Sequence, residues 1–559
     1  MRLAPLVLAM LCVAVLFSGL DRIGLTDARE ARDSQVAREL VESREVLTPL
    51  FGQEPLFEKP VLAYAPEAVA RMLPESRDLR SRQLRAMIAV LLLILIASVA
   101  AQHFGLRAAV FSAAVLATSL ALPLASRTDS TQLIATLFGW LGCAGLSDAL
   151  FGRRAGSEVR LVVTYAALAG ALLCAGPLPA LWPLGAVAFY SAVARDSRGW
   201  KRVHPVPGLV FMAGLALPWY GAMTERYGAL FLAHAPIFPY GVEPRGPWFA
   251  GALMALTFLI VGFFPWSTLL PGALLHAATW WRKVRSAAAP APGIEPSLEG
   301  MDPVSRERRE ESAAHFFVAA LLAALVPIAF YPTAPLPAAL PALPAAALLC
   351  GRFLDHLFED AARVSQPLAR ATGLLAVFGS VAAVLLTVAS GRVRGAAPEI
   401  RLLASVMLVT TWAPFLANFI GRRRAAAILM TLPVALGTPI ATMRLLPAMA
   451  GYLNTREVAV AMSAVAPPRA PLVLLEPPPP SLRLYAQRNF VVDTPLAAAL
   501  HRGRAGDGLT YLAFRPSREH DAARAAPEPL EILLRTPSLV LARVHSGDVA
   551  PVADTTSSR

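Results

Sequence analysis

The chain has 559 residues, of which 56% are hydrophobic and only 16% are charged, and its formal net charge is +13. Soluble domains carry about 25% charged residues, so this composition excludes an ordinary soluble protein and indicates long membrane-spanning segments. The positive charge does not indicate nucleic acid, because the basic residues gather in short loops between apolar runs. No zinc-finger, helix-turn-helix or RNA-binding signature is present.

The first apolar run covers residues 3–20, behind a lone Arg2. No A-x-A-like cleavage site precedes Asp21, so we expect an uncleaved first span with its N-terminus in the cytoplasm rather than a signal peptide. The charged residues 21–85 then form the first external loop. Two amphipathic helices in this loop should lie in the plane of the membrane surface. Their apolar faces consist of Val36, Ala37, Leu40 and Val41 in the first, and Val69, Met72 and Leu73 in the second.

Twelve more apolar runs follow, each near the ~20 residues needed to cross the hydrocarbon core. They cover residues 86–102, 108–125, 131–150, 161–176, 180–194, 205–223, 249–275, 315–330, 336–351, 371–390, 401–420 and 425–445. With the first run they make about thirteen spans, so the predicted fold class is a mainly α, polytopic membrane protein.

Charge in the loops predicts the orientation of these spans. If the first loop is external, the most basic short loops all fall in the cytoplasm, as the positive-inside rule requires. They are Arg153–Arg154, Arg195–Arg202, Arg282–Arg309 and Arg422–Arg424. The loop 391–401 is a mild exception.

Two segments differ in composition from the spans. Residues 283–313 are rich in proline, alanine and charge, which is typical of a flexible cytoplasmic linker. After the transmembrane domain, residues 1–445, residues 446–559 should form a small α/β domain, which is external because the number of spans is odd. Its β-like runs are Leu472–Leu475, Leu482–Tyr485 and Leu539–Val544, and residues after about Ala550 are expected to be disordered.

Short motifs in the first loop match a known pattern. They are Glu30-Ala31-Arg32, Ala37-Arg38-Glu39-Leu40, Thr48-Pro49 and Phe57-Glu58-Lys59-Pro60. This loop resembles the first external loop of the polyprenyl-phosphate-sugar-dependent glycosyltransferases of the GT-C superfamily. That family includes bacterial relatives of the protein O-mannosyltransferases and the lipid A aminoarabinose transferase. Weaker matches continue at Arg127-Thr128-Asp129, Gly176-Pro177, Pro218-Trp219-Tyr220, His234, Phe264-Pro265-Trp266-Ser267 and Ser481-Leu482-Arg483-Leu484-Tyr485, the last resembling the start of a strand.

The resemblance implies a multi-pass enzyme of the bacterial inner membrane whose site faces the periplasm or cell exterior. It would move a sugar from a polyprenyl phosphate to a hydroxyl group of a lipid, such as a lipid A-like molecule, or of a protein. A carboxylate that takes the proton of the acceptor hydroxyl contributes ~10²–10⁴-fold to such a reaction. Cations that neutralise the departing phosphate add electrostatic stabilisation. Lys59 and an arginine of the loop are the candidates for this second role, and Glu58 stands beside Lys59 in the motif.

The carboxylate base stays open between Asp27 and Glu30. Counted without gaps from Arg38-Glu39, the family's Asp-Glu pair falls on Arg29-Glu30, so an arginine stands where the resemblance implies the aspartate. Asp27 and Glu30 also have the spacing of a helix capping box, and a glutamate on a surface helix is commonly just solvated. Arg29 is placed among the substrate-binding candidates.

Asp129 is a further catalytic candidate. Its structural alternative is the N-cap of the helix that follows, but polar groups at membrane depth usually face a cavity, which favours function. Arg127, His234 and Tyr240 are substrate-binding candidates, although a lone histidine is more often structural. In the family the glutamate at Glu58 can approach a divalent metal, but one carboxylate does not define a metal site.

Two departures from the family pattern leave the identities of donor and acceptor open. The family's Lys-Gly-Pro is Ala175-Gly176-Pro177, and residues 333–337 lack the lysine and tyrosine that relatives often carry. Because of Arg29, a non-catalytic lipid-binding or envelope-assembly protein is the second hypothesis. A transporter ranks last, since no inverted repeat is evident. The transferase hypothesis requires Glu58, Lys59 and Asp129 to converge on one pocket at the outer membrane surface.

Overall fold

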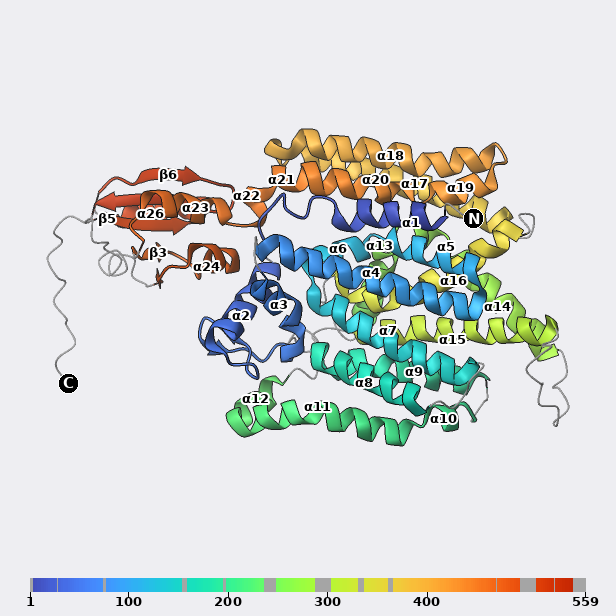
Figure 1. The fold of residues 1–559 in the computed structure, drawn as a ribbon. Helices are drawn as coiled ribbons and strands as arrows, with labels where there is room; N and C mark the ends of the chain where they lie inside the picture. The colour runs from blue at the N-terminus through green and yellow to red at the C-terminus, as the bar shows by residue number, and fades with distance from the viewer. Residues whose placement is uncertain are drawn as a thin grey trace. The chain divides into compact units, whose positions relative to one another are not determined.

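The computed structural model describes most of the chain. The described residues are 4–27, 29–73, 77–152, 158–194, 198–235, 248–286, 303–329, 336–359, 365–468, 470–492, 509–526 and 528–545. Contacts within the chain divide it into two compact units. We call residues 1–22 and 37–445 the membrane unit, and residues 23–36 and 446–559 the C-terminal unit. Figure 1 shows their elements.

Up to Leu445, the described residues form helices and one small hairpin. The elements before Phe151 are α1 (Ala4–Cys12), η1 (Val13–Phe17), α2 (Glu30–Ser43), β1 (Leu50–Phe51), β2 (Glu54–Pro55), η2 (Val61–Tyr64), α3 (Ala65–Met72), α4 (Arg77–Phe104), α5 (Leu106–Ala117), α6 (Ala121–Thr128) and α7 (Ser130–Phe151). Those that follow are α8 (Glu158–Ala175), α9 (Pro177–Ala194), α10 (Arg198–Val203), α11 (Pro205–Tyr227), α12 (Ala229–His234), α13 (Trp248–Gly262), η3 (Trp266–Thr268), α14 (Leu270–Ser286), α15 (Pro303–Ala329), η4 (Leu336–Ala342), α16 (Leu343–Glu359), α17 (Ser365–Ser390), η5 (Arg394–Ala396), α18 (Ala397–Phe419), α19 (Arg423–Leu429), α20 (Leu432–Ile440) and η6 (Ala441–Leu445).

Within the described residues, nine helices are long and apolar enough to cross a membrane, and there are up to eleven such spans if each of two bent pairs counts as one. Helices α5 and α6 form one bent pair, at 57°, and α13 and α14 form the other, at 116°. Two shorter apolar helices cover Leu6–Phe17 and Ala180–Ala194. The predicted class, a polytopic helical membrane protein, therefore agrees with the structure, but the predicted count of about thirteen spans is not confirmed.

The two bends pack against each other. Leu120, between α5 and α6, donates its backbone N–H to the carbonyl of Phe264 at 3.0 Å. Phe264 precedes Pro265, which has no N–H and so cannot continue the hydrogen bonding of α13. A broken helix at membrane depth needs such contacts, because no water is present there to satisfy the freed backbone groups.

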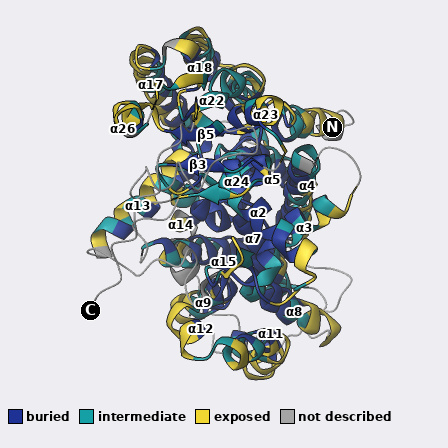
Figure 2. Ribbon diagram, turned by 90° about the vertical axis from the view of Figure 1, so that its left-hand side faces the viewer, coloured by how far each residue is buried: buried dark blue, intermediate teal, exposed yellow. Residues whose placement is uncertain are grey.

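The membrane unit has a continuous apolar core crossed by α16. Of the most apolar 18 residues in the segment Leu336–Glu359, 94% are buried inside the protein. The corresponding share is 33% in α17 and 28% in Gly199–Tyr227. Figure 2 shows the exposed residues that run along α11, α17 and α18. Trp140 of α7 is fully buried, and its indole Nε1–H donates to the carbonyl of Pro341 at 2.8 Å. Exposed apolar faces around a packed core are what a hydrocarbon surrounding requires.

The helices of the membrane unit run between two ends. Elements α10 and α19, which carry Lys201, Arg202 and Arg423, lie at one end, whereas α3 and α12 lie at the opposite end (Figure 1). Arg422, directly before α19, belongs to the first of these ends.

The first-loop helices form where they were predicted, and α2 is more buried than its amphipathic pattern indicates. Its polar residues Asp33, Gln35 and Glu39 are each 5% exposed or less. Alternating apolar and polar faces cannot reveal this, because a polar face can be buried when hydrogen-bond partners from other elements reach it. Helix α3 does present an exposed apolar edge, with Val69 and Met72 exposed by 46% and 73%.

The predicted linker is shorter than 283–313. Helix α14 continues to Ser286 and α15 begins at Pro303, so charged residues that looked like linker are helical. Proline at the first position of α15 is favourable because its missing N–H has no helical partner there. Residues 287–302 lie outside the described residues.

The C-terminal unit contains a five-stranded mixed sheet of order β4-β3-β5-β7-β6. Its elements are α21 (Leu446–Ala448), α22 (Ala450–Leu453), α23 (Arg456–Val465), β3 (Leu472–Leu474), α24 (Pro480–Ala486), β4 (Phe490–Val491), β5 (Leu509–Phe514), η7 (Pro516–Arg518), α26 (Glu519–Ala525), β6 (Glu531–Arg535) and β7 (Val540–His545). Strand β3 is parallel to β4 and β5, and β7 is antiparallel to β5 and β6. The α/β character agrees with the composition of this segment.

One predicted strand is a helix. Leu482–Tyr485 lies within α24, which follows the proline run, has Pro480 in its first turn and ends before Gln487 at φ +49°. Proline fixes a helical φ at a helix start, so the local signal favoured a helix over the β-like composition. Leu25 N donates to the Tyr485 hydroxyl at 2.6 Å, so part of the first loop packs on this helix within the C-terminal unit. The predicted disordered end after Ala550 lies outside the described residues.

Candidate active site

Lys59 of the first loop reaches the first turn of α7. Its ammonium Nζ donates to Thr131 Oγ1 at 3.1 Å, across 72 residues of sequence, and lies 5.6 Å from the centre of the Tyr64 ring. Lys59 is 6% exposed, Thr131 2% and Tyr64 is fully buried. A buried ammonium needs such partners, because removing it from water is costly. The Lys59 and Arg127-Thr128-Asp129 motifs therefore come together in the fold.

Apolar contacts on both sides hold Lys59 at this point. After it, Leu62 of η2 packs with Ile134 and Ala135 of α7. Before it, Phe57 packs edge-on against Phe231 of α12, with ring centroids 5.5 Å apart. Burial of an aromatic side chain is strongly favourable. The Phe57-Glu58-Lys59-Pro60 motif therefore lies between α12, which Phe57 contacts, and α7, to which the Lys59 ammonium donates.

Asp129 is the N-cap of α7. Its Oδ1 accepts the backbone N–H of Gln132 at 3.0 Å, and the residue is 1% exposed. Asp129 is thus the predicted N-cap. Its catalytic role remains a prediction. The beginning of a long helix carries partial positive charge, and Lys59 adds a full charge beside it. The Asp129 carboxylate accepts one of the free N–H groups at this helix start, so positive and negative charge lie side by side here.

Arg127 has partners within the membrane unit. Its Nη1 donates to the carbonyl of Pro123 at 3.0 Å, and its Nη2 donates to the carbonyls of Val15 at 3.0 Å and Ser18 at 2.9 Å. These bonds join the end of the first apolar helix to α6. Val15 and Ser18 lie in and after the π-helical turn η1, whose carbonyls need donors. Arg127 therefore ties two helices together, a role that its motif did not indicate.

Asp27 and Glu30 both lie in the C-terminal unit. Asp27 Oδ1 accepts the backbone N–H of Ser481 at 2.7 Å, and burial raises the pKa of Asp27 although the hydrogen bonds from Ser481 lower it in part. Glu30 is 2% exposed, and its Oε2 accepts from the backbone N–H and hydroxyl of Thr26 at 2.9 and 3.3 Å. Glu30 thus returns to Thr26 rather than to Asp27, which differs from the predicted capping box. Arg29 beside it is half-buried.

The other predicted site residues are less defined by the structure. Glu58 is half-buried. His234 ends α12, is exposed, and its Nδ1 lies 3.0 Å from the carbonyl of Leu230 in the same helix, which is the structural alternative for a lone histidine. Tyr240 lies outside the described residues. In the part of the chain that the structure describes, no group of three or more His, Cys, Asp or Glu residues could hold a metal ion.

Comparison with solved structures places this arrangement in a known fold. The chain aligns with the crystal structure of ArnT from Cupriavidus metallidurans bound to undecaprenyl phosphate at a TM-score of 0.74, covering 96% of this chain and 97% of ArnT at 18% identity. The apo state of the same protein aligns at 0.72, with the same coverage and identity. ArnT is a lipid A aminoarabinose transferase with the GT-C fold.

This chain has the GT-C fold. The archaeal oligosaccharyltransferase AglB from Archaeoglobus fulgidus aligns more weakly, at a TM-score of 0.49 and 12% identity over 93% of this chain and 70% of AglB. No protein-family model matches the sequence, and a search of the curated proteins finds no match.

Two buried carboxylates that the sequence analysis left out of the site support the first loop of this GT-C fold. Glu39 accepts the backbone N–H groups of Gly52 and Gln53 at 3.0 and 3.1 Å, in a turn where both residues have positive φ. Glu67 of α3 pairs with Arg85 of α4, Oε1 to Nη1, at 3.6 Å. Arg85 is the last charged residue before the apolar run 86–102, and nothing in its local sequence identifies Glu67 as its partner.

A different signal distinguishes Lys59. Of 51 lysine and arginine residues, only three are lysines: Lys59, Lys201 and Lys283. A lysine ammonium is a compact point charge, whereas arginine is a planar fork. Because almost all other basic residues of the chain are arginines, the buried Lys59 indicates a position that suits a compact ammonium group better than a guanidinium.

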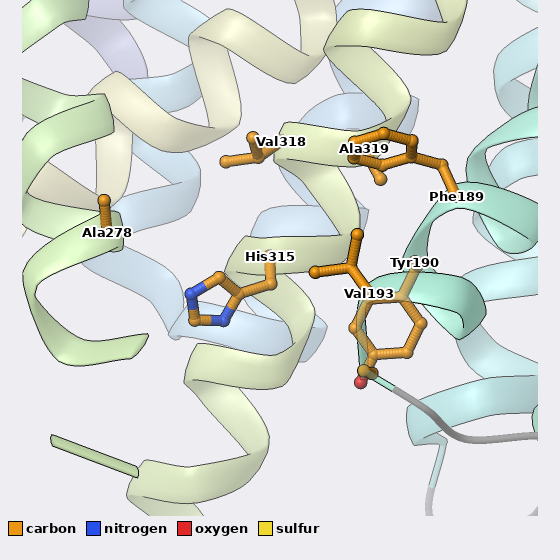
Figure 3. Close-up of a pocket in the computed structure, with 8 residues that line it drawn as sticks. Phe189, Tyr190, Val193, Ala278, His315, Val318 and Ala319 are labelled. Carbon is orange, nitrogen blue, oxygen red and sulfur yellow. The ribbon is translucent and has the colours of Figure 1, made fainter. Parts of the chain in front are cut away.

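Two cavities lined by described residues lie away from Lys59. One, of about 180 Å³, lies between α9, α14 and α15, with the His315 imidazole beside Val193 and Tyr190 (Figure 3). The other, of about 330 Å³, lies between α8 and α11 and is lined by Tyr165 and Phe211 among others. None of the predicted site residues lines either cavity.

Proposed function

We propose that this protein is a membrane glycosyltransferase that moves a sugar from a polyprenyl phosphate to a hydroxyl group of a lipid or protein. The observation that carries the proposal is the buried Lys59 ammonium held at the first turn of α7 in a chain with the GT-C fold. The neighbour ArnT was crystallised with undecaprenyl phosphate, which supports a polyprenyl-phosphate donor here.

The chemistry asks for positive charge where the sugar departs from the phosphate. Lys59 and the first turn of α7 supply it, because negative charge grows on the bridging oxygen as the bond to the sugar breaks. Their burial strengthens this interaction, since the surrounding dielectric is lower than that of water. Glu58, next to Lys59, and Arg29 are further candidates for contact with the substrate.

A carboxylate must also take the proton of the acceptor hydroxyl, and Asp27 and Glu30 are the candidates. A raised pKa makes a carboxylate a stronger base, which favours Asp27. Glu30 holds the family position. Asp129 is retained as a third carboxylate of the site, with its cap to α7 as its structural contribution.

For orientation, we propose a bacterial inner-membrane protein with the arginine-rich end in the cytoplasm. The opposite end, with Lys59, then faces the periplasm or cell exterior. The N-terminus lies in the cytoplasm and the C-terminal α/β domain outside.

The test is transfer of a labelled sugar from a polyprenyl phosphate in membranes that contain the full-length protein. Lys59→Met should lower transfer strongly by raising KM for the donor, whereas Lys201→Met, at an exposed lysine on α10, should not. Of Asp27→Asn and Glu30→Gln, the variant at the base should lower kcat by ~10²-fold or more. Undiminished transfer in Lys59→Met, Asp27→Asn, Glu30→Gln and Asp129→Asn alike would contradict the proposed site. Mass analysis of glycolipids and envelope glycoproteins in a deletion strain identifies the sugar and acceptor.

A second candidate function rests on Arg29, which stands where the resemblance implies an aspartate base. A non-catalytic lipid-binding or assembly protein would bind the polyprenyl phosphate through Lys59 without transferring sugar. Two results together would favour this candidate. The wild-type protein would bind polyprenyl phosphate without transferring sugar, and Lys59→Met would abolish this binding.

A further inference from the structure

We infer that the buried ion pair between Glu67 and Arg85 positions Lys59. The pair acts on Lys59 through the short helical segment that joins Lys59 to Glu67. The enzymatic consequence rests on the proposed function, whereas the effect on Lys59 itself does not.

The side chains of Glu67 and Arg85 are almost completely buried. Both side chains are only 1% exposed, with Arg85 Nη1 3.6 Å from Glu67 Oε1. The hydroxyl of Ser81, one turn before Arg85 on α4, also donates to Glu67 Oε1 at 3.3 Å. Removing either charge leaves the other buried without its counter-ion, which is strongly unfavourable. The pair therefore fixes the position of α3 along α4.

No flexible residue separates this anchor from Lys59. Pro60 follows Lys59, η2 (Val61–Tyr64) follows Pro60, and α3 begins at the next residue, so the segment is helical from Val61 to Glu67. Tyr64, the last residue of η2, is the ring over which the Lys59 ammonium lies. A shift of α3 along α4 would therefore move Tyr64 and Lys59 with it, away from Thr131.

The membrane unit contains a matched pair for comparison. Glu311 of α15 and Arg352 of α16 lie 3.7 Å apart, with side chains 6% and 10% exposed. This second pair resembles the first in chemistry, distance and burial, but it belongs to helices that carry no predicted site residue. Glu311→Gln thus measures what loss of a buried ion pair does to the membrane unit in general.

The experiment compares purified full-length wild type, Glu67→Gln and Glu311→Gln. The first readout is the rate at which an amine-acylating reagent modifies Lys59 relative to Lys201, followed by mass spectrometry. Lys59 is buried and Lys201 is exposed, so the ratio reports how well Lys59 is held. The second readout is the split between KM for the polyprenyl-phosphate sugar and kcat. Thermal unfolding shows whether the two variants are destabilised to a similar degree.

We expect both variants to unfold at lower temperature, but only Glu67→Gln to raise the Lys59 acylation ratio several-fold. Only Glu67→Gln should raise the donor KM, by about tenfold, since a misplacement of about 1 Å can cost about 100-fold. Glu67→Asp, which keeps the charge, should recover part of both. An unchanged acylation ratio in Glu67→Gln, or an equal rise in Glu311→Gln, overturns the inference. If no variant, wild type included, transfers sugar, the proposed function fails while the acylation ratio still decides the positioning role.

Discussion

Lys59 and Thr131 are joined by a hydrogen bond of 3.1 Å between two buried side chains, one from the first loop and one from the first turn of α7. Thr131 Oγ1 is the acceptor that keeps the ammonium beside the helix start. The bond is a direct contact between the loop motif and the helix that Asp129 caps, and either partner can be substituted to test it.

Thr131→Val removes this acceptor while keeping the shape of the side chain. We expect the free energy of unfolding to fall by about 1–3 kcal/mol, because a buried charged donor loses a partner. Donor affinity should fall as well, because Lys59 is held less firmly. Titration with polyprenyl phosphate and thermal unfolding of the purified protein provide the measurements.

Thr136→Val is the matched control for this prediction. Thr136 lies on the same helix, is fully buried, and its Oγ1 has no hydrogen-bond partner in the part of the chain that the structure describes. Valine there should leave stability equal or slightly higher and donor affinity unchanged. Equal effects of the two substitutions would mean that the Lys59 bond contributes nothing specific.

Substitutions of Asp129 separate its cap from any role in transfer. Asp129→Ala should destabilise the protein by about 1 kcal/mol, because the Gln132 N–H loses its acceptor. Asp129→Asn keeps a good N-cap and should keep the melting temperature near that of the wild type. A loss of transfer activity in a stable Asp129→Asn protein identifies a chemical role. If Asp129→Asn is fully active and Asp129→Ala is less stable, Asp129 acts only as the N-cap of α7.

Arg127→Met tests whether this residue binds substrate or holds the fold. Three carbonyls lose a donor, so the free energy of unfolding should fall by about 1–3 kcal/mol or more. The donor KM of the remaining folded protein should stay close to that of the wild type. Arg401→Met, which removes an exposed arginine whose Nε donates to the carbonyl of Ala397 in its own helix, is the control and should change neither quantity. A large rise in donor KM without loss of stability would mean that Arg127 binds substrate, as the sequence analysis predicted.

The pH dependence of stability in the C-terminal unit should reveal Asp27. Because burial raises the pKa of Asp27, the folded state holds this proton at a pH where the unfolded chain has released it. Its contribution to stability is therefore present at low pH, and it is lost as pH rises from the unfolded pKa, about 3.9, through the raised folded pKa. Asp27→Asn should flatten this decline. Hydrogen exchange of the β3, β5 and β7 amides measures it.

Glu531, in strand β6 of the same unit, provides a contrast of opposite sign. Its hydrogen bonds with Arg543 lower the pKa of Glu531, so its contribution is present above the unfolded pKa and is lost as pH falls through the folded one. Glu531→Gln should remove that loss at low pH and leave the decline due to Asp27. If both substitutions changed the profile in the same direction, the assignment of Asp27 would be wrong.

The sequence by itself determined the properties that depend on neighbours along the chain. The apolar runs predicted the long helices because the length of a span is a local property. The Phe57-Glu58-Lys59-Pro60 motif singled out Lys59.

Tertiary structure alone decided which partners the polar residues have. Only the fold shows that Lys59 meets Thr131, that Arg127 bonds the first helix, that Glu67 pairs with Arg85, and that the polar face of α2 is buried. The physical reason is the same in each case. A buried polar group is satisfied by whatever donor or acceptor lies nearest in space, and that partner can stand far away in the sequence.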